Sequence, residues 1–454
     1  MAMLKSAFHR LFAVFADTDE LCADTQLCHS DRNIHFYGAN KKIFRSFFAA
    51  LAVGTFISML GIILYYVLAF ASLYNGSNNF DWLLGIFSDF VVIMNFSLEE
   101  SPYVVGDSSY PPIAIAILYP FALICKNAFL KYSFTELTAD ELTAKMAMHS
   151  QFWVAVILFF VICSVLTVLL VARLFGIKGK DILTLGVIIL LSAPFVFAVM
   201  RGNTIYFALI FLLAFLILKD QKNPFARELG YFCLAFAGAI KIYPLFFGVF
   251  LLKDKKIFAS FRVALYFGLI SVFSFLMMKN SFDNFSPFLN HLGGFMSNEL
   301  RLLGLNNLSM SAHLYRFLHI FIRTLDAESA LFSAINLSVL ILLFLISTVA
   351  AVATKSNFSR YVICFAIVLL VPSISYFYVL IFAILPFMEY LRTYASLSLS
   401  KRVFYFFGFM VLFLTPLILA QNFTFHSAVV IAMLIVELVA VFGELKNKRK
   451  LKGA

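Results

Sequence analysis

Three ionisable residues, Asp89, Arg201 and Lys241, stand among apolar neighbours that do not explain their charge. Lys241 lies about 12 residues from either end of its apolar stretch, too deep for its side chain to reach an aqueous edge. Ionisable residues at such depth are costly and usually face a cavity. A desolvated carboxylate can serve as a general base, whereas an Arg and a Lys together suit a phosphate or diphosphate. We therefore predict a general base at Asp89 and an anion site at Arg201 and Lys241.

Each of these residues also has a structural interpretation. Asp89 follows an apolar stretch and could be an exposed loop acid, and Asp81 is a weaker candidate for the same base. Arg201 and Lys241 could instead pair with an internal acid, although few acids occur in the apolar segments. Three further acids have polar neighbours and are expected to be solvated: Glu99, Glu100 and Asp107.

A second group of polar residues lies within residues 280–329. A loop of about 50 residues is long enough to carry function, although each polar residue by itself is expected to be structural or solvated. Its histidines have no metal-ligand spacing, and the chain has no P-loop, GxSxG or HExxH sequence. We therefore expect no metal and no cofactor. The candidates for weaker substrate contacts in this segment are His291, Arg301, Asn307, Ser309 and His313.

The composition identifies the environment in which these residues must be positioned. Of 454 residues, 62% are apolar and 13% charged, and the mean hydropathy is +0.94. A soluble domain is nearer half apolar and a quarter charged. Uncharged runs long enough to span a bilayer recur along the chain, and in lipid such runs satisfy their backbone as helices. The sequence therefore predicts an all-α polytopic membrane protein with about 10 to 12 membrane segments. It excludes a cytosolic enzyme, a disordered regulator and a disulfide scaffold.

The net charge of +11 does not indicate a nucleic-acid partner. The Lys and Arg residues form short clusters between the apolar runs, which is the arrangement of topology determinants at the cytoplasmic edge. The six Cys residues are scattered: four lie in or beside apolar segments, and Cys22 and Cys28 have no partner pair at zinc spacing.

The positive-inside rule orients the chain. Residues 1–46 are basic and amphipathic, with no evident cleavable signal peptide, and are predicted to lie on the cytoplasmic surface. No Lys or Arg occurs in 47–73, the first predicted crossing, or in the acidic loop 74–112, which is therefore expected outside. Residues 280–329 contain no Lys and form the second predicted outer loop, and 446–454 form a basic cytoplasmic tail.

Three apolar segments, 182–218, 229–252 and 361–391, have basic residues at both ends and an interruption in the middle. The interruptions are Ala193-Pro194 with Arg201-Gly202-Asn203, then Lys241-Ile242-Tyr243-Pro244, then Pro372-Ser373-Ile374-Ser375-Tyr376. The second segment is too short for two crossings at roughly 20 residues each. Irregular backbone at membrane depth is tolerated where it lines a cavity. We therefore predict three hairpins whose tips face one outward-opening cavity.

Residues 111–130 and 151–172 leave the topology open. They lie between an outer loop and a cytoplasmic cluster, so together they must make an odd number of crossings. Either 111–125, kinked at Pro120, are re-entrant, or the loop from Arg173 to Lys180 breaks the charge rule.

Short motifs follow one another in a distinctive order between residues 47 and 390. They are Asp89-Phe90, Pro102-Tyr103, Tyr110-Pro111-Pro112, Arg201-Gly202-Asn203, Lys241-Ile242-Tyr243-Pro244 and Asn307-Leu308-Ser309-Met310. In this order they resemble glycosyltransferase family 87, membrane enzymes of the GT-C class that use polyprenyl-phosphate sugars. A Pro-x-Ser-Trp-x-His-Tyr element of that family is echoed by Pro372, Ser375-Tyr376 and Tyr378, but Tyr376 replaces the Trp and the His is absent. Residues 101–112 are also similar to the PIG-M type of mannosyltransferase.

The resemblance implies a GT-C-like catalytic domain over 47–445 and an inverting sugar transfer at the outer face of the membrane. Mannose, or another hexose or pentose, would move from a polyprenyl-phosphate donor to a glycolipid or glycan acceptor. Asp89 would deprotonate the acceptor hydroxyl, while Arg201 and Lys241 would hold the donor phosphate. Weaker substrate contacts are implied for Tyr103, Tyr110, Asn203, Tyr243 and Tyr376. We expect the location to be a bacterial inner membrane.

Two other functions fit parts of the pattern. A transporter or lipid flippase would also have broken helices and buried ions, but such proteins often show an internal repeat, and none is evident here. A polysaccharide polymerase or ligase with a diphosphate-linked donor would use similar cations.

Overall fold

The computed structural model describes residues 86–98, 102–104, 108–132, 137–323, 326–414 and 424–452, together with residues 49 and 53. Every regular element in these ranges is a helix, so the predicted all-α fold is confirmed. Several predictions fall outside the described residues: the cytoplasmic segment 1–46 and first crossing 47–73 (apart from residues 49 and 53), the acids at 81, 99, 100 and 107, and the cysteines at 22 and 28.

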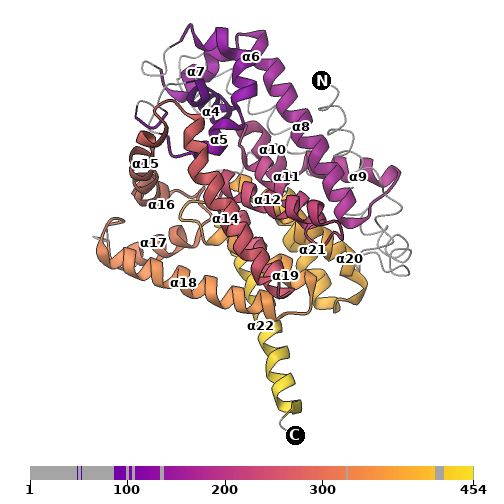
Figure 1. Ribbon diagram of the computed structural model, residues 1–454. Helices are drawn as coiled ribbons and strands as arrows, with labels where there is room; N and C mark the ends of the chain where they lie inside the picture. Colours follow the sequence, from indigo (N-terminus) through magenta and orange to yellow (C-terminus); the bar gives the residue numbers. More distant parts are fainter. Residues whose placement is uncertain are drawn as a thin grey trace.

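In the first half of the described chain, α11 and α12 lie near the middle of the molecule and α4 to α7 lie together at one end (Figure 1). In order they are α4 Ser88–Leu98, α5 Pro112–Ala116, α6 Tyr119–Phe129, α7 Ala139–Met146, α8 Ser150–Phe175, α9 Lys180–Leu191, α10 Ala193–Arg201, α11 Ile205–Leu218, α12 Pro224–Ile240, η2 Tyr243–Gly248 and α13 Val249–Lys253.

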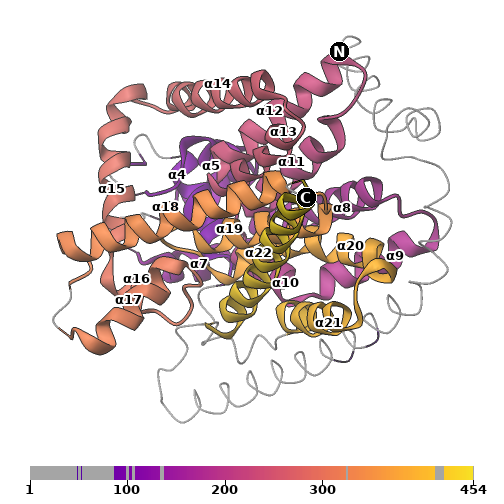
Figure 2. The ribbon, with the colours of Figure 1, turned by 90° about the horizontal axis from the view of Figure 1, so that it is seen from below.

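The second half contains the buried elements α19, η5 and α20 together with helices nearer the surface (Figure 2). In order they are α14 Ile257–Phe273, η3 Ser274–Met277, η4 Ser281–Asn284, α15 Phe285–Ser297, α16 Glu299–Leu303, α17 Met310–Phe321, α18 Ala330–Ala353, α19 Asn357–Leu370, η5 Phe377–Ala383, α20 Ile384–Thr393, η6 Tyr394–Ser396, α21 Leu399–Leu414 and α22 Thr424–Lys452.

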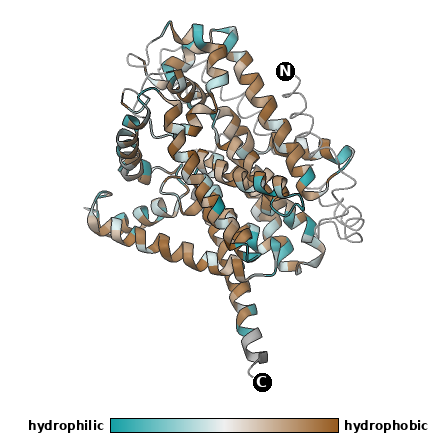
Figure 3. Ribbon diagram, viewed as in Figure 1, coloured by the Kyte–Doolittle hydropathy of each residue, from teal (hydrophilic) through white to brown (hydrophobic). Residues whose placement is uncertain are grey.

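Length and apolar character make five helical stretches of the described residues candidate membrane spans: 150–175, 257–277, 330–353, 377–396 and 425–447. A sixth candidate is the pair α9 and α10, which is bent by 62° at Ser192. The outward surfaces of α14 and α18 carry large exposed apolar side chains, and both helices are strongly hydrophobic along their length (Figure 3). Such faces need lipid or another apolar neighbour. The protein is therefore a polytopic helical membrane protein.

Helix length bears on the parity of residues 111–130 and 151–172. Helix α8 has 26 residues and can cross a bilayer, whereas α5 and α6 have 5 and 11 residues and cannot. One crossing in this region satisfies the required odd number. The lengths therefore favour the re-entrant interpretation of residues 111–125.

The core consists of helices that are apolar on all sides. Almost every residue of α11 and α19 is buried, as expected for a helix without a polar face. Helix α11 packs along α12 and α8, and α19 packs against α18, α20 and α22. Helix α11 begins after the buried Asn203 and Thr204, and α19 ends just before the third interruption, so one end of each helix supplies irregular backbone to the interior.

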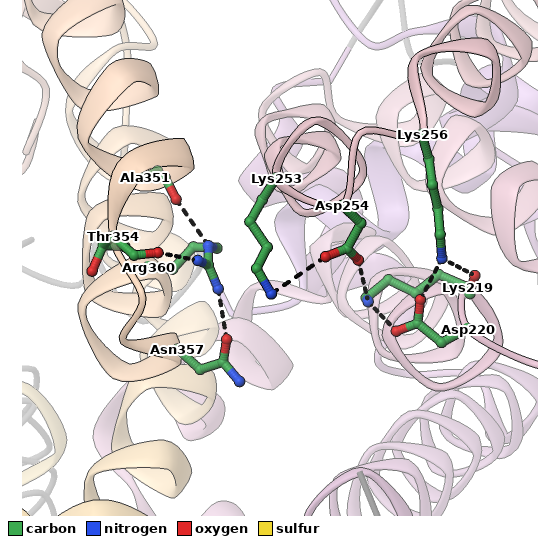
Figure 4. Close-up of polar contacts among 9 residues, drawn as sticks. All are labelled: Lys219, Asp220, Lys253, Asp254, Lys256, Ala351, Thr354, Asn357 and Arg360. Atoms are coloured by element: carbon green, nitrogen blue, oxygen red, sulfur yellow. Dashed lines mark hydrogen bonds and ion pairs between the residues drawn. The ribbon is translucent and has the colours of Figure 1, made fainter. Parts of the chain in front are cut away.

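Two turns that carry basic residues, one after α11 and one between α13 and α14, are joined by ion pairs (Figure 4). We call these residues the ion-pair cluster: Lys219, Asp220, Lys253, Asp254 and Lys256. Lys256 Nζ lies 2.6 Å from Asp220 Oδ1, and Lys219 pairs with both Asp220 and Asp254. The cluster fastens the turn after α11 to the turn between α13 and α14.

Candidate active site

A cavity of about 1360 Å³ lies where the three interrupted segments meet. Its lining includes Arg201 at the end of α10, Lys241 after α12 and Tyr376 before η5. The prediction that the three tips share one cavity is therefore confirmed; the side to which it opens stays a prediction. The polar lining residues with ionisable or phenolic side chains are Asp89, Tyr110, Arg201, Lys241, Tyr243, Arg301, Tyr376 and Tyr378.

Asp89 lies in the first turn of α4 and is 8% exposed. Its Oδ1 accepts a hydrogen bond of 2.5 Å from the Arg201 guanidinium, and its Oδ2 accepts one of 2.8 Å from Asn203 Nδ2. These two donors fix the orientation of the carboxylate. An ionised carboxylate offers about four lone-pair sites, so capacity remains for the proton of a hydroxyl group in the cavity. Arg201 thus has the internal acid partner that the sequence left open.

The Arg201-Gly202-Asn203 motif forms this arrangement through its backbone. Helix α10 ends at Arg201 because Gly202 adopts the left-handed conformation, with φ of 63°. A Cβ atom on Gly202 would lie 2.2 Å from Phe90 Cβ, so only glycine allows this close approach to α4. Asn203 Oδ1 accepts a hydrogen bond of 3.0 Å from Ile205 N at the start of α11. The amide nitrogen of Asn203 is thereby turned toward Asp89.

Lys241 follows α12 in an extended conformation and is enclosed by aromatic rings. Its Nζ lies 5.2 Å from the ring centroid of Tyr110 and 5.8 Å from that of Tyr378. These are cation–π distances. Within the described ranges, no carboxylate forms an ion pair with Lys241. The two predicted cations therefore differ: Arg201 is held by an acid, and Lys241 by aromatic faces.

The weaker candidates divide into two groups. Tyr110, Tyr243, Arg301 and Tyr376 line the cavity. The other six are not part of its lining and hold the elements that form it: Tyr103, Asn203, His291, Asn307, Ser309 and His313. Direct substrate contact by this second group stays a prediction, and the contacts described next indicate a positioning role for it.

Asn307 and Ser309 hold the third tip in place. Asn307 Oδ1 accepts from Ser375 N at 3.0 Å, and its Nδ2 lies 3.3 Å from Ser373 O. Ser309 Oγ donates to Ser373 O at 2.7 Å. Both side chains are fully buried. The Asn-x-Ser motif therefore positions the backbone that carries Tyr376.

Tyr103 and His291 join the segment before α5 to α15, and His313 joins α17 to α22. The Tyr103 hydroxyl donates to Tyr110 O at 2.7 Å, and His291 Nε2 hydrogen-bonds with Tyr103 O at 2.8 Å. His313 Nε2 hydrogen-bonds with Ser427 Oγ of α22 at 2.6 Å. Burial, together with the neighbouring charge of Arg316, lowers the pKa of His313 to about 4. His313 is therefore neutral at pH 7.

One wall of the cavity was not anticipated from the sequence. Aromatic rings from α14, η3 and α15 line it, namely Phe267, Phe275, Phe285, Phe288 and Phe295. Phe275 contacts two of the others edge to face, with ring centroids 5.6 and 5.9 Å apart. Tyr378 was also missed as a site residue, although its position two residues after Tyr376 was a usable signal. The cavity is thus polar at the tips and aromatic on this wall, which suits a lipid with a polar head group.

No group of three or more His, Cys, Asp or Glu side chains suited to a metal ion occurs in the described parts of the chain. The ionisable groups at the cavity are instead one carboxylate and three cations, Asp89, Arg201, Lys241 and Arg301. What this set can do is accept a proton from a hydroxyl group and stabilise negative charge on a ligand.

Fold and site together define a helical membrane protein with a carboxylate and cations in an amphiphilic cavity. The model of glycosyltransferase family 87 matches residues 109–373, which is more than half of the chain. The chain belongs to glycosyltransferase family 87 and is a membrane glycosyltransferase. Neither the curated proteins nor the solved structures include a match to the chain. The family match includes Arg201 and Lys241 and begins after Asp89, so the structure is what joins Asp89 to the matched region.

Proposed function

We propose that the protein transfers a sugar from a polyprenyl-phosphate donor to a hydroxyl group of a glycolipid or glycan acceptor, with inversion at the anomeric carbon. The observation that carries this proposal is one cavity in which Asp89, Lys241 and an aromatic wall are combined. The carboxylate suits the acceptor hydroxyl, the ammonium group suits the phosphate, and the rings suit the isoprenoid chain. The positive-inside pattern supports an active site on the outer face of a bacterial inner membrane.

In this mechanism Asp89 takes the proton of the acceptor hydroxyl. The hydroxyl oxygen attacks the anomeric carbon, the bond from that carbon to the phosphate oxygen breaks, and polyprenyl phosphate leaves with the bonding electrons. Lys241 stabilises the charge that grows on the leaving phosphate. Arg201 keeps Asp89 oriented and contributes its guanidinium charge at the cavity surface. No metal ion or cofactor enters this mechanism, because side-chain cations supply the positive charge.

The decisive experiment replaces the base. Asp89→Asn is reconstituted in lipid vesicles and given labelled polyprenyl-phosphate sugar and acceptor. Since an amide cannot accept the proton, transfer should fall by about 10²- to 10⁴-fold. The matched control is Asp283→Asn, an exposed acid outside the cavity lining, which should retain full activity. Unchanged transfer by a normally expressed Asp89→Asn protein would overturn the assignment of the base.

A diphosphate-linked donor is the second candidate, because three cations line the cavity. Parallel assays with monophosphate- and diphosphate-linked sugars separate the two donors. We expect turnover with the monophosphate. Movement of the lipid across the vesicle without formation of a glycosidic bond would instead support a flippase.

A further inference from the structure

Arg301 is a second cavity cation that no carboxylate of the described chain neutralises. It lies in α16 and lines the cavity. Its guanidinium carbon is 3.8 Å from the ring centroid of Phe295. A guanidinium stacked on an aromatic face keeps its N–H groups at the edge available, because the ring occupies only its face. Arg301 is thus held in a geometry that leaves donors for a planar, bidentate ligand such as phosphate.

The fold connects Arg301 to the element that faces Lys241. Asn307 Nδ2 lies 3.2 Å from Arg301 O and 3.3 Å from Ser373 O, so one side chain joins α16 to the third tip. That tip continues into Tyr378, whose ring centroid is 5.8 Å from Lys241 Nζ. Arg301 and Lys241 therefore line one cavity, and Asn307 links the backbone of Arg301 to the tip whose Tyr378 ring lies against Lys241.

The three cations of the cavity lining differ in whether a carboxylate balances their charge. Asp89 and Arg201 form an ion pair, so their charges cancel to a first approximation. Lys241 and Arg301 remain, which leaves two positive charges in the lining. A lipid phosphodiester carries one negative charge, and a phosphate monoester carries about 1.5 to 2 at neutral pH. The remaining positive charge thus matches the charge of a released lipid phosphate.

We propose that Arg301 and Lys241 form the phosphate subsite of this cavity, and that Arg201 acts mainly as the positioning residue of Asp89. This inference rests on the proposed function and refines it. It assigns the donor phosphate to Arg301 as well as Lys241, in place of Arg201 of the Arg-Gly-Asn motif. The ligand is a lipid-linked phosphate, which could be the phosphate of the donor or one carried by an acceptor lipid.

The experiment measures binding in the absence of sugar transfer. Three labelled lipids are bound to the full-length protein in vesicles: polyprenyl phosphate, polyprenol, which lacks the phosphate, and phosphatidic acid, which represents a phosphate-bearing acceptor lipid. The variants are Arg301→Gln and Arg301→Lys, and the matched control is Arg323→Gln, an exposed arginine that does not line the cavity.

We expect Arg301→Gln to weaken the binding of polyprenyl phosphate by about 10- to 100-fold, the value of one or two hydrogen bonds to a charged group. Polyprenol binding should change little, Arg301→Lys should recover part of the loss, and Arg323→Gln should bind both lipids normally. If only a phosphate-bearing acceptor lipid is weakened, the subsite is retained and its ligand is the acceptor.

Two outcomes would overturn the inference. Equal weakening of both lipids would mean that Arg301 only maintains the shape of the cavity. Unchanged binding of every phosphate-bearing lipid would mean that Arg301 does not contact phosphate, while transfer by the wild type would leave the proposed function intact. Failure of the wild type to bind polyprenyl phosphate at all would count against the proposed function itself.

Discussion

The cavity and the ion-pair cluster both contain several cations, but most of these cations have different partners in the two regions. In the cluster, Lys219 and Lys256 both meet Asp220. In the cavity, Lys241 and Arg301 meet aromatic rings instead. Partly exposed ion pairs contribute little to stability, about 0 to 1 kcal/mol each, and serve here to join two turns. A cation held without an acid is costly at depth, which is the expected arrangement where an anionic ligand completes the site.

Arg360 shows that burial alone does not identify a functional cation. Its side chain is fully buried, yet its guanidinium donates to Ala351 O, Thr354 O and Asn357 Oδ1 at 2.5 to 2.8 Å (Figure 4). These acceptors close the turn between α18 and α19 and use the donors of the side chain. Among the described cations, Lys241 and Arg301 therefore differ from Arg360 in that their contacts are with aromatic rings, which leave their N–H donors for a ligand.

The largest predicted effect is a loss of sugar transfer when Lys241 of the cavity, but not Lys256 of the ion-pair cluster, is replaced. Lys241→Met should reduce kcat/KM for sugar transfer by about 10²- to 10³-fold, because it removes a charge that stabilises the leaving phosphate. Lys256→Met loses one ion pair with Asp220 and should cost less than about 1 kcal/mol of unfolding free energy, with transfer unchanged. Steady-state kinetics in vesicles tests both variants. An equal loss of transfer in both variants would contradict the functional distinction between the cavity and the ion-pair cluster.

A second comparison uses two glycines with similar backbone angles. Gly202 at the cavity has φ of 63° and Gly176 after α8 has φ of 70°, but only at Gly202 would a Cβ atom collide with Phe90. Gly202→Ala should therefore destabilise the protein by about 3 kcal/mol, and Gly176→Ala by about 1 kcal/mol. Thermal unfolding in detergent measures the difference, and transfer should fall only for Gly202→Ala. Similar losses at both positions would show that the contact with Phe90 is unimportant.

The smallest effect concerns the neutral His313. Its pKa of about 4 in the folded protein lies below the ordinary value of 6.5. Between these values the unfolded chain binds more protons, so stability falls as the pH is lowered from 6.5 to about 4. The loss attributable to this side chain is on the order of 2 to 3 kcal/mol. His313→Gln should flatten that part of the stability profile, and a profile identical to that of the wild type would contradict the assignment.

Much of the site was predictable from the positions of the few ionisable residues within the apolar segments. Asp89, Arg201 and Lys241 were recognisable because apolar neighbours surround them, and the interrupted helices indicated a common cavity. The partner of Arg201 was not predictable, because Asp89 is 112 positions away in the sequence and their contact depends on how α4 meets α10. The structural role of Asn307 was hidden for the same reason, since its hydrogen-bond partner Ser375 lies 68 positions further along the chain.

The sequence by itself determined that this protein is helical and lies in a membrane, since long uncharged runs can satisfy their backbone in lipid only as helices. It also determined which ionisable residues needed an explanation. Only the tertiary structure decided how those charges are paired. Pairing depends on distances of a few ångströms between side chains of separate helices, and those distances are set by packing details such as the absent Cβ at Gly202. This is why Arg201 proved to be the partner of Asp89, and why Arg301, one of several weaker candidates in the sequence, emerged with Lys241 as a phosphate ligand to test.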